Sequence, residues 1–163
     1  TVNNAGKNDG TGKTARETRA IAGWFESDRA TDTQLNKWGR EIYPKCAYNT
    51  LMLRKERYGN IPIYVTENGH GCYDVPDENG YVEDDDRIAF LNDYIGWILK
   101  AKEDGVNVKG YYCWSTMDLY SWINGYKKRY GLVRVDYEDG QLRRIPKKSY
   151  YWYRDFIAEH KDV

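Results

Sequence analysis

The chain has 163 residues, and its 25 basic and 25 acidic side chains cancel to a net charge of zero. This length allows one domain with a hydrophobic core, and the balanced charge provides no field that would recruit nucleic acid or an anionic membrane. Aromatic residues make up 15% of the chain, with 16 Tyr and 6 Trp. Such a content suits a pocket that stacks flat apolar groups, or equally a tightly packed core.

Cysteine and histidine usage argues against metal chemistry. The three cysteines, Cys46, Cys72 and Cys113, are spaced unlike any zinc or redox motif, and the only histidines are His70 and His160. The sequence therefore predicts no metal site and no cofactor. It also has no apolar run of transmembrane length and no signal-peptide pattern, which favours a soluble protein in the reducing cytoplasm, although a removed leader stays open.

Residues 1–37 are rich in Asn, Gly, Lys, Thr and Asp, and we predict a loop-rich or truncated lead-in to a domain at residues 38–163. The run Gly10 to Thr14 resembles the tail of a phosphate-binding P-loop. That motif requires Gly where Lys7 stands, and it requires a preceding strand that the pattern does not show. We therefore reject it.

A regular pattern begins at Tyr43. Pro44 opens a predicted helix that ends at Gly59, and a nearly continuous apolar strand follows at residues 61–66, as in a parallel strand covered on both faces. The inner face of the helix holds four apolar residues: Ala47, Tyr48, Leu51 and Met52. A second helix begins at the acidic run 84–86 and ends at Gly105. Its apolar positions have helical spacing: Ile88, Leu91, Ile95 and Ile98.

A second strand is predicted at residues 108–115 and a final helix at 149–160. Between them, residues 129–135 and 141–145 flank Asp139-Gly140, a strong hairpin signal. Alternating helices and strands imply a parallel α/β sheet with right-handed crossovers, but two strands cannot close into a barrel. Since a complete (β/α)8 barrel needs about 250 residues, the chain is predicted to be at most a part of one.

Glu67 ends the first predicted strand, just before Gly69. In a parallel sheet the carboxyl ends of the strands face the ligand crevice, so an acid there is placed to attack a substrate or to take a proton. The alternative is a solvated turn residue, which is the usual place of a Glu.

Three long motifs carry a resemblance to a known family. They are Tyr64-Val65-Thr66-Glu67-Asn68-Gly69, Trp114-Ser115-Thr116-Met117-Asp118, and Gly125-Tyr126-Lys127-Lys128-Arg129-Tyr130-Gly131-Leu132 followed by Val135-Asp136-Tyr137. In this order and spacing, residues 38–160 resemble the carboxy-terminal part of glycoside hydrolase family 1, the β-glucosidase family.

The resemblance implies a (β/α)8 TIM barrel in which Glu67 is the nucleophile of a retaining β-glycosidase, with a hairpin excursion after the last strand. In the family a second acid, in an Asn-Glu-Pro motif after the fourth strand, protonates the leaving group. That tripeptide does not occur in this sequence. The implied partner is thus the amino-terminal part of the barrel, possibly as a separate chain. We interpret the remaining candidates, Asp118 and Glu41, as structural.

The resemblance also implies sugar contacts. Trp114 would form the floor of the sugar subsite, its alternative being a core Trp. Ser121 stands where plain β-glucosidases place Glu, and with Lys128 and Tyr130 it resembles the family's members specific for 6-phospho-β-glycosides. Removal of a carboxylate together with one cation and two hydroxyl groups suits a phosphate. The alternative for residues 127–129 is a solvated basic loop.

With Trp122, the chain resembles the family's phosphogalactosidases more than its phosphoglucosidases, which tend to have a small residue there. A phosphorylated substrate implies a cytoplasmic enzyme supplied by phosphorylating import. Two other functions stay open at this point: a β-glucosidase acting on plain β-glucosides, and a noncatalytic half-barrel that binds sugar or a partner chain.

The chain departs from the family pattern in three places, namely Asn3-Asn4 without a following Tyr, Arg40 in place of an aromatic, and Cys46-Ala47 in place of Gly-Leu.

Overall fold

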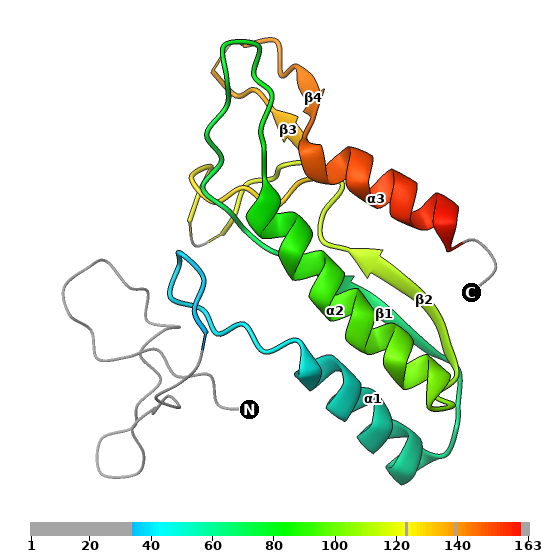
Figure 1. The fold of residues 1–163 in the computed structure, drawn as a ribbon. Coiled ribbons are helices and arrows are strands. Elements are labelled where there is room, and N and C mark those ends of the chain that lie inside the picture. Colours follow the sequence, from blue (N-terminus) through cyan, green and yellow to red (C-terminus); the bar gives the residue numbers. More distant parts are fainter. Residues whose placement is uncertain (1–33, 123, 139, 161–163) are drawn as a thin grey trace, which may run out of the picture. The chain divides into compact units, whose positions relative to one another are not determined.

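The computed structural model describes residues 34–122, 124–138 and 140–160. The chain divides into two units, Thr1–Tyr43 and Pro44–Val163, and every described helix and named strand belongs to the second (Figure 1). In the first unit, the side-chain oxygen of Asn36 accepts hydrogen bonds of 2.9 Å from the backbone N–H groups of Trp38 and Arg40, which closes a turn. The P-loop-like run 10–14 and the pair Asn3-Asn4 lie outside the described residues.

The three predicted helices are present within about two residues of their expected bounds. They are α1 (Lys45–Tyr58), α2 (Asp85–Glu103) and α3 (Lys148–Glu159). Helix α1 ends at Gly59, whose φ of 76° lies in the left-handed region that only glycine adopts readily. Helix α2 follows Asp84 and carries acidic residues in its first turn, where negative charge meets the positive end of the helix dipole.

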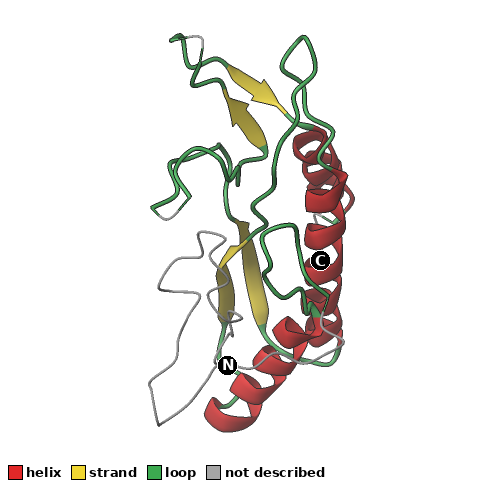
Figure 2. Cartoon of the chain, turned by 90° about the vertical axis from the view of Figure 1, so that its left-hand side faces the viewer, coloured by secondary structure: helices red, strands yellow, loops and turns green. Residues whose placement is uncertain are grey.

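Two parallel strands, β1 (Ile63–Asn68) and β2 (Val108–Cys113), lie side by side, and α2 is the crossover between them. Figure 2 shows the helices on one side of these strands. A buried cluster from α1, α2 and the start of β2 packs there, and Ile63 and Val65 of β1 contact it. Its buried members are Leu51, Ile98, Ala101, Val106 and Val108. This confirms the predicted inner face of α1 and, at Ile98, that of α2; Leu91 and Ile95 are buried in a second cluster, and Ile88 is half-buried.

The opposite face of the sheet is exposed among the described residues, so the prediction that β1 is covered on both faces is wrong for this part of the chain. Tyr64 and Thr66 of β1 and Tyr112 of β2 are exposed on it. Parallel strands of a closed barrel bury this face because side chains from the other strands fill the interior. We call this surface the open face of the sheet.

The predicted hairpin is present with shorter strands, β3 (Val133–Val135) and β4 (Arg144–Pro146), which pair antiparallel. The segment leading into β3 is attached to the chain after β2: Leu132 N–H donates to the Ser115 carbonyl at 3.0 Å. Leu132 also packs with Leu91 and Ile95 of α2 in a second buried cluster that α3 covers. The hairpin thus continues from the carboxyl end of the sheet rather than forming a separate module.

Among the residues that the structure describes, no group of three His, Cys, Asp or Glu side chains is arranged to hold a metal ion. In the same residues, no helix combines the length and apolar character needed to cross a membrane.

Candidate active site

A β-bulge places Glu67 on the open face. Val65 pairs with Tyr111 and Asn68 pairs with Cys113, so β1 has one residue more than β2 between these two pairs. Such an extra residue interrupts the alternation of side chains and re-aims the residues beside it. Glu67 is exposed and Asn68 half-buried, whereas strict alternation would turn Glu67 to the same side as Val65, toward the helices. The carboxylate therefore faces solvent at the carboxyl end of the strand.

Asn68 fixes the backbone beside Glu67. The Tyr111 hydroxyl donates to Asn68 Oδ1 at 2.8 Å, and the Asn68 carbonyl accepts a hydrogen bond of 2.7 Å from Trp114 N–H. Burial raises the pKa of Tyr111 well above its ordinary value, so the phenol stays protonated and remains a donor. The sequence pattern assigned no role to Asn68 or Tyr111, because the side-chain contact joins residues 43 positions apart.

Trp114 follows β2 directly and is 41% exposed, so it is not a core residue among the described parts of the chain. The chain leaving Glu67 passes against its backbone: a Cβ on Gly69 would lie 1.7 Å from the Trp114 carbonyl oxygen. Only glycine fits at position 69. The predicted nucleophile and the predicted sugar platform are therefore held at neighbouring strand ends.

Ser121 and Trp122 lie on a separate small loop. Ser121 and Gly125 exchange backbone hydrogen bonds of 2.9 and 2.8 Å, and the Ser121 hydroxyl accepts a bond of 3.2 Å from Asn124 N–H. Ser121 itself is buried, whereas Trp122 is 95% exposed. The Ser121 O–H proton is not used in that bond, so the hydroxyl keeps its capacity to donate.

Lys128 is only 7% exposed, so the interpretation of residues 127–129 as a solvated loop is wrong for this residue. Its stem lies over Gly71, where a Cβ would come within 2.4 Å of Lys128 Cε. Its ammonium nitrogen is 5.5 Å from the centre of the Tyr130 ring, within cation–π range. The predicted cation and the predicted phenol thus form one unit.

Backbone pairing joins this unit to both strand ends. Cys72 and Arg129 exchange hydrogen bonds of 2.8 and 3.0 Å, and Ser115 N–H donates to the Tyr130 carbonyl at 3.2 Å. The segment with Lys128 and Tyr130 is therefore attached to the residues that follow Glu67 and to those that follow Trp114. The structure brings these four predicted residues onto adjoining segments and leaves Ser121 and Trp122 on the loop beyond them.

Asp118 is buried and has the structural role predicted for it. Its carboxylate accepts hydrogen bonds from Lys147 Nζ at 2.8 Å and from Gly131 N–H at 2.9 Å. Lys147 is fully buried and lies 2.5 Å from Asp74 as well. Burial raises the pKa of Asp74 although Lys147 opposes that effect. The Asp118 carboxylate therefore joins the segments that contain Gly131 and Lys147, and it is not on the open face of the sheet.

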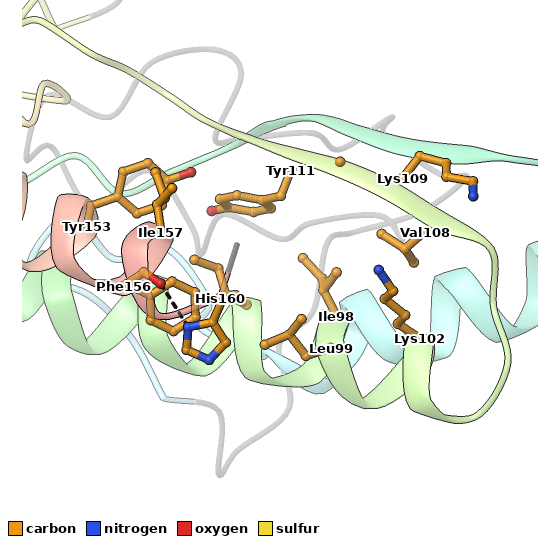
Figure 3. A pocket seen from close by; sticks show the side chains of 12 residues that line it. Ile98, Leu99, Lys102, Val108, Lys109, Tyr111, Tyr153, Phe156, Ile157 and His160 are labelled. Carbon is orange, nitrogen blue, oxygen red and sulfur yellow. Dashed lines mark hydrogen bonds between the residues drawn. The ribbon is translucent and has the colours of Figure 1, made fainter. Parts of the chain in front are cut away.

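A pocket of about 290 Å³ lies between α2, β2 and α3 (Figure 3). It is on the covered side of the sheet, because its walls include Val108 and Tyr111, which pack toward the helices. Lys102 and Lys109 also line it, and His160 Nδ1 lies 2.8 Å from the Phe156 carbonyl oxygen. The pocket is on the face of the sheet opposite to the one that Glu67 occupies, so it is separate from the predicted sugar site.

Adjacent parallel strands with helices on one face, and with an exposed acid and an aromatic residue at their carboxyl ends, are the arrangement expected of part of a (β/α)8 barrel enzyme. A family model, "Glycosyl hydrolase family 1", matches residues 3–162. The chain belongs to this family.

Known relatives agree with this assignment. The chain is 46% identical to a 6-phospho-β-galactosidase of Staphylococcus epidermidis over 81% of its length and 28% of the relative's. It is 46% identical to a 6-phospho-β-glucosidase of Bacillus subtilis over 75% of its length and 26% of the relative's. A solved family 1 β-glucosidase from Thermotoga maritima superimposes on 82% of this chain and 29% of its own, with a TM-score of 0.74 and 40% identity. The chain thus spans under a third of each of these proteins.

Proposed function

We propose that this chain is the carboxy-terminal part of a retaining β-glycosidase that hydrolyses 6-phospho-β-galactosides or 6-phospho-β-glucosides. Residues 38–163 belong to a single (β/α)8 domain in this proposal, and Glu67 is its nucleophile. The observation that supports it most is the bulge in β1, which exposes Glu67 on the open face beside Trp114. The names of the two phosphoglycosidase relatives support the substrate class.

The chemistry requires two carboxyl groups. A Glu67 oxygen attacks the anomeric carbon and the glycosidic C–O bond breaks, while a general acid gives its proton to the leaving oxygen. Water then cleaves the glycosyl ester as the same group, now a base, takes a proton from it. The amino-terminal part of the barrel supplies this acid/base, either in one chain or as a partner chain.

Three side chains account for selection of a phosphate at the sugar 6-position. Ser121 introduces no negative charge, Lys128 supplies a cation, and the Ser121 and Tyr130 hydroxyl groups are donors. Trp122 contacts the sugar from the exposed tip of its loop, and Trp114 forms the floor. A sugar phosphate is charged and does not cross a bilayer unaided, so the substrate also favours a cytoplasmic location.

The test uses a completed barrel, in which this chain is joined to or co-expressed with the amino-terminal part of the Staphylococcus epidermidis relative. We expect p-nitrophenyl 6-phosphoglycosides to react at least about tenfold faster than plain glycosides, as each tenfold needs only about 1.4 kcal/mol. Preference for the plain glucoside would overturn the roles of Ser121, Lys128 and Tyr130 and favour a plain β-glucosidase.

A mechanism-based fluoro-sugar tests the nucleophile itself. We expect mass spectrometry to find the label on Glu67 in the completed barrel and not in the chain alone. Turnover by a Glu67→Gln variant equal to that of the unaltered protein would refute the assignment. An inactive completed barrel that still binds sugar would favour the noncatalytic half-barrel instead.

A further inference from the structure

Arg87, in the first turn of α2, contacts two segments of the candidate active site. It is 1% exposed. Its guanidinium group donates to the His70 carbonyl oxygen and, at 3.3 Å from both terminal nitrogens, to the Arg129 carbonyl oxygen. The same group pairs with Asp84 at 2.7 Å and with Asp74 at 3.2 Å. The buried Arg87 cation is thus paired with two carboxylates, and its other N–H groups donate to backbone carbonyl oxygens.

The two carbonyl groups belong to two segments to which we assign different roles, attack on the sugar and binding of the phosphate. His70 lies three residues after Glu67, and Arg129 follows Lys128 directly. A guanidinium is a planar fork whose N–H directions are fixed relative to one another, whereas an ammonium is a point charge on a flexible stem. Arg87 therefore sets the spacing between the segment that follows Glu67 and the segment that carries Lys128.

A second contact links the same two segments. The stem of Lys128 rests on Gly71, and a Cβ there would also come within 2.7 Å of Lys128 Cγ. Because that carbon lies close to the backbone of Lys128, the side chain cannot avoid a methyl group by moving only its end. The backbone pair between Cys72 and Arg129 continues the junction.

We propose that Arg87 is a positioning residue that fixes Lys128 relative to Glu67, so that holding the 6-phosphate also aligns the anomeric carbon for attack. The inference rests on the proposed function and deepens it: the helix that covers the sheet couples phosphate recognition to the nucleophile. A 1 Å misplacement far from the reacting atoms costs about 100-fold in rate when geometry is the catalytic device.

A double-mutant cycle in the completed barrel tests this coupling, with a p-nitrophenyl 6-phosphoglycoside as substrate. Arg87→Lys keeps a cation beside Asp84 but loses the fork. We expect it to lower kcat/KM by about 10- to 100-fold in the unaltered background and by about twofold or less in the Lys128→Ala background, since coupled residues are not additive. Equal factors in both backgrounds would overturn the proposal.

Gly71→Ala provides a second route that leaves the ion pairs of Arg87 intact, and it decides the matter if Arg87→Lys does not fold. We expect kcat for the phosphorylated substrate to fall about tenfold with a smaller change in KM, because a displaced phosphate no longer aligns the anomeric carbon in the transition state. The matched control is Gly96→Ala in α2, where an added Cβ would meet nothing within 4 Å, and it should leave both constants unchanged. An unchanged kcat in Gly71→Ala would contradict the proposal.

Turnover that survives in Glu67→Gln removes the proposed function and the coupling with it. Glu67-dependent hydrolysis of the phosphorylated substrate with an additive cycle removes the coupling alone.

Discussion

The two faces of the β1–β2 sheet differ in what they contain. The covered face presents Ile63, Val65 and Val108, which pack in one cluster with Leu51 of α1 and Ile98 of α2. The open face presents Tyr64, Tyr112, Trp114 and the carboxylate of Glu67, all exposed among the described residues. The first face stabilises the fold of this unit, and the second holds the side chains to which we assign chemistry.

A (β/α)8 barrel separates the groups that stabilise it from the groups that carry its chemistry. The strands are held in place from one side by helices, so their other side is free to present polar and aromatic groups at the strand ends. The buried Asp74–Lys147–Asp118 group and Arg87 extend this support to the loops beyond the strands. Substitutions on the two faces should therefore change different observables.

The largest effect is expected for Glu67→Gln on the open face. We expect the completed barrel to lose at least about 10⁴-fold in kcat, the order found when a nucleophile is removed. The thermal midpoint of the chain should stay within about 2 °C because an exposed Glu contributes little to stability. A large drop in the midpoint would show that this face also stabilises the fold. Activity assays and thermal unfolding give the two readouts.

Leu91→Ala on the covered side should have the opposite profile. Leu91 of α2 is fully buried and packs in one cluster with residues of α3, so its truncation should cost about 2–5 kcal/mol of unfolding free energy. Urea unfolding of the chain measures this cost. Ile88→Ala, at a half-buried position of the same helix, is the control and should cost less. Equal costs would mean that α3 does not cover Leu91 in solution.

Thiol reactivity provides a smaller test of burial. Burial raises the pKa of Cys72 and of Cys113 to about 11, so both thiols are neutral at pH 8, whereas Cys46 is exposed on α1. With Ellman's reagent at pH 8 we expect one fast thiol, and two that react at least about 100-fold more slowly because the thiolate is the reactive form. The slow thiols should accelerate as the pH rises toward 11. Three fast thiols at pH 8 would contradict the packing.

The smallest effect is expected for Tyr112→Ala, and only in the chain alone. Because the Tyr112 ring is exposed there, its loss should change the unfolding free energy by no more than about 0.5 kcal/mol. In the completed barrel the same substitution should cost about 3–5 kcal/mol, as for a buried aromatic ring. Urea unfolding of both forms makes the comparison. An equal, small cost in both would mean that the open face does not become the barrel interior.

Local signals in the sequence predicted most of the elements. Pro44 and Gly59 bound α1, the acidic run at 84–86 opens α2, and Gly140 lies between β3 and β4 as expected. These signals work because capping, dipole and turn preferences depend on residues a few positions apart. The coverage of β1 was predicted wrongly because an apolar run indicates which side chains can be buried, and not which elements are present to bury them.

The candidate site was predictable in its residues and not in its construction. Glu67 was proposed from its place at a strand end, and Trp114, Lys128 and Tyr130 from the motifs that carry the family resemblance. The β-bulge at Glu67 and the contact of the Lys128 side chain with Gly71 could not be predicted from the sequence, because each depends on contacts between distant segments. Arg87 carried no signal at all, since a charged residue in the first turn of a helix is ordinarily exposed.

By itself, the sequence determined the order of helices and strands, the residues able to do chemistry and the resemblance to one family, because all three are written in local pattern and residue type. Tertiary structure alone decided which face of the sheet Glu67 occupies, how deeply Lys128 is buried and what holds the two in register. These depend on strand pairing, close backbone approach and a buried guanidinium, and such contacts exist only when distant parts of the chain are brought together.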